Sequence, residues 1–266
     1  MEKRVSSRPG AVMLHPAMAD AALRFEDFTA NAEAFLRKEI RADVMVDICA
    51  VALEFAEDAA YRKSVHKYRF LANVALERYY DAMADALAML TEFEDAHQHY
   101  SMMCSLSLKR WNYARALDYV DRILALSLEN GLDARTLEED RDELEIFLSR
   151  ILCFSAQEFS LAMTRALGVE GAAAVREYAG VPLQITGRAT VLVHPASRVP
   201  YLVFQADGYV VRSIYCQMPE SELPFIRHVE EGRNATVFGY LLSADSDKIL
   251  LQPSRLVAAH SSHPLL

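Results

Sequence analysis

The chain has 266 residues, of which 52% are apolar and 24% charged, as is usual for a globular protein of one or two domains with a buried core. Its net charge of −9 is unevenly distributed, because residues 181–266 hold seven acidic and seven basic side chains and the acidic excess lies before them. Such a chain lacks the broad positive surface that attracts nucleic-acid backbones, so non-specific nucleic-acid binding is disfavoured.

The cysteines and the apolar runs indicate a cytoplasmic protein. The four cysteines are far apart and form no C-x-x-C pair, which is typical of buried thiols in a reducing compartment. The apolar run at residues 11–14 is too short for a secretory signal. The most apolar window, residues 44–56, contains Asp47 and Glu54, so we expect no transmembrane segment.

Glycine and proline divide the chain into two parts. Neither residue occurs between Pro16 and Gly131, whereas seven of the nine glycines and seven of the nine prolines follow residue 167. Because glycine and proline interrupt regular structure, this pattern predicts long helices followed by short strands with turns. We expect a flexible N-terminus over residues 1–17, an all-α domain over 18–175, a β-barrel domain over 181–258 and a disordered tail over 259–266.

Apolar side chains recur at helical spacing through the first part, and the segments follow in chain order. Thr91 and Glu94 have the spacing of a capping box that begins a helix. Gly131 fits the position that ends one helix, and Gly168 that of the next. The predicted helices cover residues 20–41, 43–60, 61–90, a segment from 91, 111–130 and 136–167.

Residues 111–126, which read Trp-Asn-Tyr-Ala-Arg-Ala-Leu-Asp-Tyr-Val-Asp-Arg-Ile-Leu-Ala-Leu, resemble the second half of a tetratricopeptide repeat. The resemblance implies a helical hairpin of a repeat array that binds other proteins. No second copy at a fixed period is evident in the sequence, and such arrays need several repeats to bury their faces. A non-repeating helical bundle with the same apolar stripe is therefore favoured.

The helical part contains one cluster of basic side chains, spread over about 160° of the predicted helix at residues 61–90. It could dock an acidic protein, a phosphate-bearing ligand or a lipid headgroup, or it could be a solvated face. Its members are Arg62, Lys63, His66, Lys67 and Arg69.

Metal binding has weaker support. Glu94 and His97 have the E-x-x-H spacing of di-iron bundles, with His99 close by, but such sites need a second E-x-x-H motif and two further glutamates. The sequence contains no second E-x-x-H. We therefore predict neither a metal site nor a cofactor. The tail residues His260 and His263 are expected to be disordered.

The second part alternates apolar and polar residues with period two, and turn residues separate the runs. Gly187 falls within the first strand, where a bulge could lie, and Asp207 and Gly208 suit a tight hairpin turn. Three strands, one short helix and two strands are the element order of an OB-fold barrel. The predicted strands cover 182–194, 199–205, 209–218, 233–243 and 248–257, and the helix lies within 219–232.

Four segments of this part form a recognisable set: residues 187–191, the third strand at 214–218 with Cys216 at its centre, the Gly-x-x-x-x-Val-x-Gly step within 229–239, and the closing apolar strand at 249–257. Together they resemble the tRNA-anti-like family of small OB domains. The resemblance covers the last third of the chain, and these motifs specify turns and core rather than a catalytic centre. It implies a five-stranded OB-fold barrel.

If Ile214, Cys216 and Met218 face the barrel interior, alternation turns the neighbouring tyrosines outward. Tyrosines near arginines could stack single-stranded nucleic acid, as OB-folds do, although the balanced charge disfavours this function. The same face could instead pack against the helical part or a partner. The candidate residues are Tyr201, Tyr209, Arg212 and Tyr215, with Arg188 and Arg198 nearby.

No G-x-S-x-G, P-loop, G-x-G-x-x-G or H-E-x-x-H motif occurs in the sequence. We therefore expect a non-enzymatic adaptor or assembly protein that binds other proteins through its helices and its barrel. The alternative is a single-stranded nucleic-acid-binding protein whose helices recruit a partner. An enzyme whose site is assembled from scattered residues stays a third hypothesis. The sequence leaves open whether the chain forms a homo-oligomer.

Overall fold

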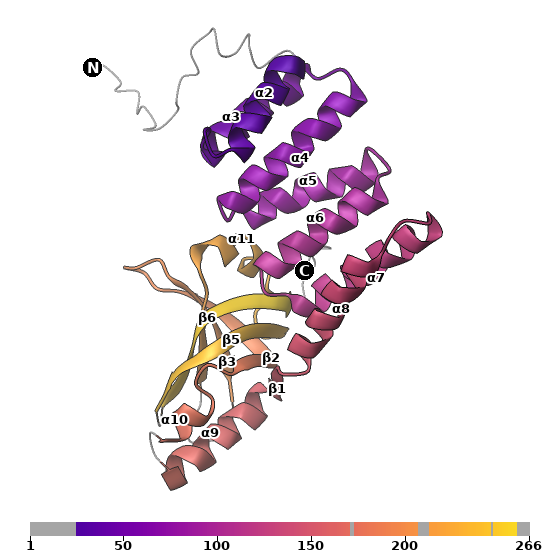
Figure 1. The fold of residues 1–266 in the computed structure, drawn as a ribbon. Helices are drawn as coiled ribbons and strands as arrows, with labels where there is room; N and C mark the ends of the chain where they lie inside the picture. The colour runs from indigo at the N-terminus through magenta and orange to yellow at the C-terminus, as the bar shows by residue number, and fades with distance from the viewer. Residues whose placement is uncertain (1–24, 171–172, 207–212, 246, 260–266) are drawn as a thin grey trace, which may run out of the picture. The chain divides into compact units, whose positions relative to one another are not determined.

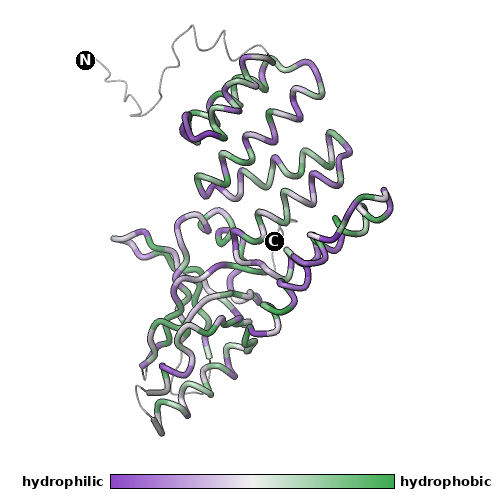
Figure 2. The backbone as a smooth tube through the Cα atoms, viewed as in Figure 1, coloured by the Kyte–Doolittle hydropathy of each residue, from purple (hydrophilic) through white to green (hydrophobic). Residues whose placement is uncertain are grey.

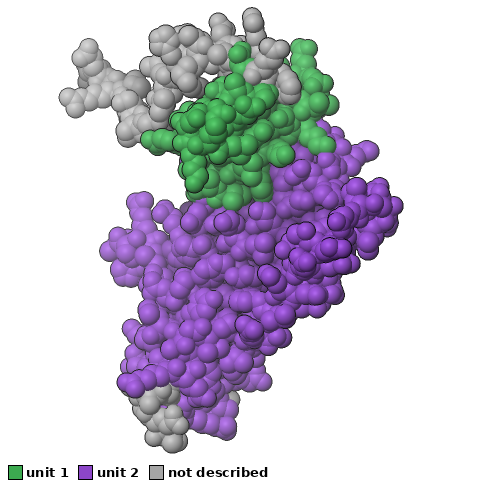
Figure 3. Space-filling view, in the orientation of Figure 1, with its two compact units in different colours: residues 1–76 green, residues 77–266 purple. Residues whose placement is uncertain are grey.

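A computed structural model describes residues 25–170, 173–206, 213–245 and 247–259. Apart from one short strand, the described chain is helical up to residue 177 and then forms a β-barrel, so the predicted α+β class with segregated parts is confirmed (Figure 1). Contacts between residues divide the chain into two compact units, residues 1–76 and 77–266, which Figure 3 colours separately. Across the described stretches, no helix is both long enough and apolar enough to cross a membrane.

The first unit contains three described helices, α2 (Phe25–Leu36), α3 (Ala42–Phe55) and α4 (Ala59–Ala75). Helix α3 packs against both α2 and α4 and buries Met45, Ile48, Cys49 and Ala52. Asp58 caps α4 by accepting a hydrogen bond from the Tyr61 backbone N–H at 2.9 Å, which satisfies one of the free donors at the helix start.

The second unit begins with four helices in two hairpins. They are α5 (Tyr79–Thr91), α6 (Ala96–Lys109), α7 (Tyr113–Glu129) and α8 (Arg135–Leu148), and each packs on the next. In Figure 2 hydrophobic and hydrophilic residues alternate along these helices, as expected of helices with one buried face.

The hairpins repeat at a 34-residue interval that the sequence did not reveal. Tyr79 begins α5 and Tyr113 begins α7, and each is followed three residues later by an alanine with no exposed surface, Ala82 or Ala116. Two residues before each start, the backbone takes a positive φ, +56° at Glu77 and +59° at Trp111. The two hairpins therefore share both a turn geometry and a buried alanine at the same helical position.

Several predicted helix boundaries are wrong. The helix predicted at 61–90 is two helices, because the chain turns at Glu77 between α4 and α5. Thr91 does not cap a helix start; it ends α5, and Asp95 caps α6 by accepting from the Gln98 N–H at 2.9 Å. The helix predicted at 136–167 is divided by strand β1 (Leu152–Ser155).

Helix α9 (Ala156–Glu170) follows β1 directly and contains Gly168, which therefore does not end the helix where predicted. Ser155 and Glu158 form a reciprocal capping box at its start: the Ser155 N–H donates to Glu158 Oε2 at 2.8 Å, and the Glu158 N–H donates to Ser155 Oγ at 3.1 Å. The short helix α10 (Ala173–Glu177) leads into the barrel.

The barrel consists of five strands, β2 (Pro182–Val193), β3 (Pro200–Gln205), β4 (Ser213–Gln217), β5 (Asn234–Ala244) and β6 (Lys248–Ala259). They follow the order β2-β3-β4-β6-β5, and β5 pairs with β2 to close the sheet. Strands β4 and β6 are parallel, and the other pairs in the ring are antiparallel. This is the OB-fold arrangement, with β1 added in parallel beside the first half of β2.

The barrel core comes from the inward side chains of every strand. Ile214 and Cys216 on β4 have no exposed surface and Met218 is 2% exposed, so the predicted orientation of this strand is confirmed. The predicted helix at 219–232 is limited to η1 (Glu220–Glu222) and α11 (Leu223–Ile226). The predicted turn at Asp207 and Gly208 lies outside the described residues.

Gly187 does not mark a bulge, because β2 pairs with β5 in unbroken register from residue 182 to 188. The position requires glycine for another reason. A Cβ atom there would lie 2.8 Å from the Cβ of Ala156 and 3.3 Å from the Phe204 ring. Gly187 therefore allows the start of α9 to approach the barrel wall.

Candidate functional site

The predicted basic residues Arg62, Lys63, His66, Lys67 and Arg69 all lie on α4, whose buried residues include Tyr61, Val65 and Phe70. Lys67 is exposed and the other four side chains are half-buried. The structure thus places the cluster on one helix, as predicted, and most of its surface is already covered.

Two of the predicted barrel tyrosines lie together. The rings of Tyr201 on β3 and Tyr215 on β4 meet edge to face with their centroids 6.3 Å apart. The Tyr201 hydroxyl donates to Gln217 Oε1 at 3.5 Å. Both tyrosines are half-buried, and the other two candidates, Tyr209 and Arg212, lie outside the described residues.

The two arginines expected near these tyrosines are exposed. Arg188 lies on β2 and lines a polar hollow of about 450 Å³ together with Arg233 and Glu231. Arg198 lies in the turn before β3 and has a positive φ of +55°. Because Glu231 lines the hollow together with two arginines, the hollow carries both negative and positive charge.

The E-x-x-H residues do not converge on a metal site. Glu94 lies in the turn before α6, and His97 lies on the exposed side of that helix. His99 is buried, with its Nδ1 at 2.7 Å from the Ala86 carbonyl oxygen. Within the described ranges, no three His, Cys, Asp or Glu side chains group closely enough to hold a metal ion.

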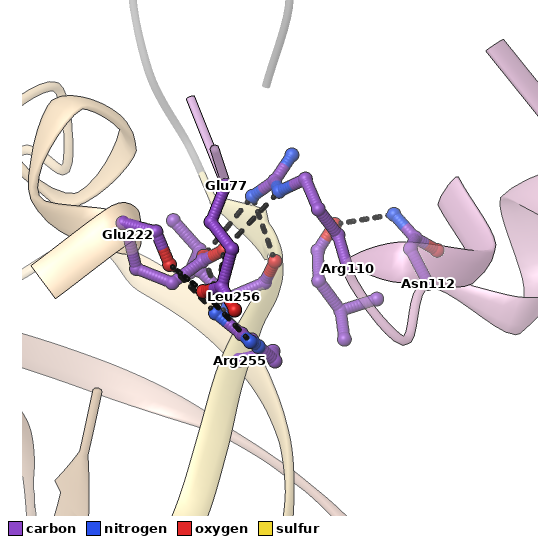
Figure 4. Close-up of polar contacts among 8 residues, drawn as sticks. Glu77, Arg110, Asn112, Glu222, Arg255 and Leu256 are labelled. Atoms are coloured by element: carbon purple, nitrogen blue, oxygen red, sulfur yellow. Dashed lines mark hydrogen bonds and ion pairs between the residues drawn. The ribbon is translucent and has the colours of Figure 1, made fainter. Parts of the chain in front are cut away.

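A buried ion cluster, which sequence analysis did not find, joins the helices of the second unit to the barrel (Figure 4). Arg110, in the turn after α6, donates to both carboxylate oxygens of Glu222 at 3.3 and 3.1 Å and to the Leu256 carbonyl at 3.2 Å. Glu222 has no exposed surface, and it also accepts from the Leu256 N–H at 3.3 Å. A guanidinium nitrogen of Arg255, on β6, lies 3.8 Å from Glu222 Oε1.

Further contacts surround this cluster. Asn112 both caps α7, by accepting from the Arg115 N–H, and donates to the Val257 carbonyl at 2.9 Å. The Arg110 guanidinium stacks 3.5 Å from the centre of the Phe225 ring. One short turn, residues 110–112, thus ends one helix, begins the next and binds the barrel.

Aromatic side chains extend the same junction along β5. The ring of Phe238, which is 1% exposed, contacts Trp111, Tyr113 and Phe147 from the helices at centroid distances of 5.9, 5.5 and 6.5 Å. Tyr240 contacts Trp111 as well, at 6.1 Å. Helices α7 and α8 therefore cover the face of β5, whereas Tyr201 and Tyr215 belong to β3 and β4.

An apolar groove of about 540 Å³ lies over α7, between α6 and α8. Leu108 and Ile146 in its walls are 38% and 54% exposed. Two acids and one base complete the lining. The groove residues are Cys104, Leu108, Tyr113, Val120, Asp140, Glu143, Leu144, Ile146, Phe147 and Arg150.

The thiol that lines the groove is poorly reactive. Cys104 is its only nucleophilic thiol, and burial together with the negative charge of Asp140 raises the pKa of that thiol. The thiol therefore stays protonated and poorly nucleophilic at neutral pH. An open apolar groove of this size can hold side chains of another molecule.

No protein-family model matches the chain. No curated protein matches it either. The resemblances to tetratricopeptide repeats and to tRNA-anti-like domains therefore stay expectations.

Part of the groove could have been found in the sequence. Helix α8 contains six acidic residues in fourteen, and no residue of it is fully buried. Large apolar residues within a strongly acidic segment, here Ile146 and Phe147, could have indicated a helix whose apolar face stays exposed. The other wall, from α6, depends on tertiary packing that the sequence does not reveal.

Proposed function

We propose that the protein is a non-enzymatic cytoplasmic adaptor or assembly protein that binds other proteins through its helices, with the barrel as a second contact surface. The apolar groove carries this proposal. Exposed leucine and isoleucine side chains that line an open hollow are typical of protein-binding sites, because covering them removes apolar area from water.

The helical hairpins support the same function. Their 34-residue interval equals the length of a tetratricopeptide repeat, and Tyr113 and Ala116 lie in the segment that resembles that family. Stacked hairpins of this kind present grooves between their helices, which other proteins occupy.

The test is affinity capture with quantitative mass spectrometry, from a lysate of the source cells. In Leu108→Asn/Ile146→Asn two exposed groove residues become polar, and we expect this variant to lose a defined set of captured proteins. Leu128→Asn/Leu132→Asn is the matched control, because these leucines are 59% and 57% exposed and lie outside the groove lining. Equal capture by wild type and both variants would contradict the proposal.

The alternative function is single-stranded nucleic-acid binding by the OB-fold barrel, and the Tyr201–Tyr215 pair favours it. Bases stack on such aromatic rings, each contributing about 1–3 kcal/mol. Fluorescence anisotropy with labelled oligonucleotides at low salt tests it. Binding that Tyr215→Ala weakens would support this function, whereas absence of binding by the wild-type chain would rule it out.

A further inference from the structure

The groove over α7 has a definite shape and charge, and together they indicate what kind of partner fits it. Helices α6 and α8 both pack on α7 and leave the groove between them. The groove floor contains Val120, which is 3% exposed, and its walls contain the exposed side chains of Leu108 and Ile146. Three helices thus form three sides of a core, and a fourth helix would complete it, as in a four-helix bundle.

The incomplete burial of α8 also indicates that a further helix can bind here. None of its residues is fully buried, although Leu144 and Phe147 face the groove. A helix in a bundle normally buries one apolar stripe completely. An added helix in the groove would bury this stripe, using side chains at i, i+3, i+4 and i+7, as in other helix-in-groove complexes.

The charge around the groove indicates the charge of the partner that fits it. Residues 77–148, which form α5–α8, contain sixteen Asp and Glu against seven Lys and Arg, an excess that equals the net charge of −9 of the whole chain. Asp140 and Glu143 line the groove itself and are exposed. Arg141, between them, forms ion pairs with Asp121 and Glu145, at 2.8 Å each.

Arg150 lines the groove as well, just after α8 ends. The charge of the lining therefore changes along the groove, from acidic beside Asp140 and Glu143 to basic beside Arg150. A partner helix with lysine or arginine flanking its apolar stripe would place these side chains beside Asp140 and Glu143. Polar groups at one end of that helix would lie beside Arg150.

We propose that the groove binds an amphipathic helix of a partner protein whose apolar stripe is flanked by basic side chains. The proposal rests on the protein-binding function proposed above and specifies the class of partner. Complementary charge at the rim of such a groove increases the association rate and selects among partners, while the apolar stripe supplies most of the affinity.

The probe is a fluorescein-labelled synthetic peptide of leucine and lysine, with leucines at helical spacing, measured by anisotropy with the full chain. Two peptides serve as comparisons: one has glutamate in place of lysine, and one has the same leucines and lysines in scrambled order. We expect the leucine–lysine helix to bind more tightly than either, because only it matches both the apolar stripe and the charge.

Two pairs of variants locate the binding. Asp140→Asn/Glu143→Gln should weaken binding about threefold to tenfold, since exposed ion pairs contribute modestly. Glu138→Gln/Glu139→Gln removes the same charge from α8 outside the lining and should change affinity less than about twofold. Leu108→Asn/Ile146→Asn should weaken binding at least about tenfold, whereas Leu128→Asn/Leu132→Asn should not. Circular dichroism and Trp111 emission check that each variant is folded.

Three results would overturn the proposal: equal weakening by the two acid variants, no effect of Leu108→Asn/Ile146→Asn, or equal binding of the lysine and glutamate peptides. If only the preference for basic peptides fails, while Leu108→Asn/Ile146→Asn still loses captured proteins, the adaptor function stands and the partner class is wrong. If that variant loses neither peptide nor captured proteins, both proposals fail.

Discussion

Glu222 is the residue on which the junction between helices and barrel depends most. Its carboxylate is completely buried and meets Arg110 at 3.1 Å and Arg255 at 3.8 Å. Removing one charge from a buried ion cluster leaves the other charges without compensation in a medium of low dielectric constant. The guanidinium of Arg110, itself 4% exposed, would then lie buried opposite a neutral group.

We therefore expect Glu222→Gln to lower the free energy of unfolding by about 3–5 kcal/mol. Urea unfolding followed by fluorescence measures this, because Trp111 is the only tryptophan and lies in the junction. Asp118→Asn is the control: it breaks the exposed pair with Arg122, at 3.1 Å, and should cost at most about 1 kcal/mol. Equal costs for the two variants would show that the cluster does not stabilise the junction.

Gly187 carries a second prediction at the residue scale. Gly187→Ala places a methyl group 2.8 Å from the Ala156 Cβ, and such overpacking costs about 1–3 kcal/mol. Ala156→Gly removes the atom that clashes, so it should restore part of this loss although it is unfavourable by itself. A double-mutant cycle from urea unfolding measures the coupling. Strictly additive effects would mean that α9 does not restrict this position.

At the scale of elements, the turns between helices explain what the sequence analysis missed. Lys38, Glu77, Glu94 and Trp111 take positive φ values between +53° and +63°, each in a turn before a helix. Non-glycine residues reach this region at a cost of about 1–2 kcal/mol. The chain therefore turns without glycine, and a segment that lacks glycine and proline is not one long helix.

Glu94 allows this cost to be tested, because its side chain is exposed and its φ is +53°. We expect Glu94→Gly to raise the free energy of unfolding by up to about 1 kcal/mol, since glycine adopts this backbone conformation without strain. Gly131→Ala is the inverse case: φ is +68°, no atom lies within 4 Å of the added Cβ, and stability should fall by about 1 kcal/mol. Thermal unfolding of both variants measures these changes in stability. A Glu94→Gly variant less stable than the wild type would contradict a cost of positive φ at this position.

The barrel was predictable to a greater degree than the helices. Alternation along β4 and the turn residues between strands gave the order of strands and the inward side chains correctly, because both signals are local. The junction was not predictable, because Arg110, Glu222 and Arg255 are far apart in the chain and each stands alone in its own segment. Only folding brings them within 4 Å.

At the scale of the whole molecule, the change from helix to strand is not the boundary between compact units. Sequence periodicity changes near residue 175, but contacts group α5–α8 with the barrel in residues 77–266. The reason lies in the junction. Phe238 on β5 and Phe225 on α11 are almost completely buried, because Trp111, Tyr113, Tyr80 and Arg110 pack against them.

A barrel without these helices would therefore expose a patch of aromatic surface, and Glu222 would lose its ion pair with Arg110. We expect a fragment of residues 77–266 to unfold in one cooperative transition, measured by both Trp111 fluorescence and circular dichroism. A fragment of residues 150–266 should instead bind the dye ANS and aggregate, because exposed aromatic patches associate. A monomeric 150–266 fragment with a sharp thermal transition and no dye binding would show that the barrel is stable without the helices, and that the junction serves a purpose other than stability.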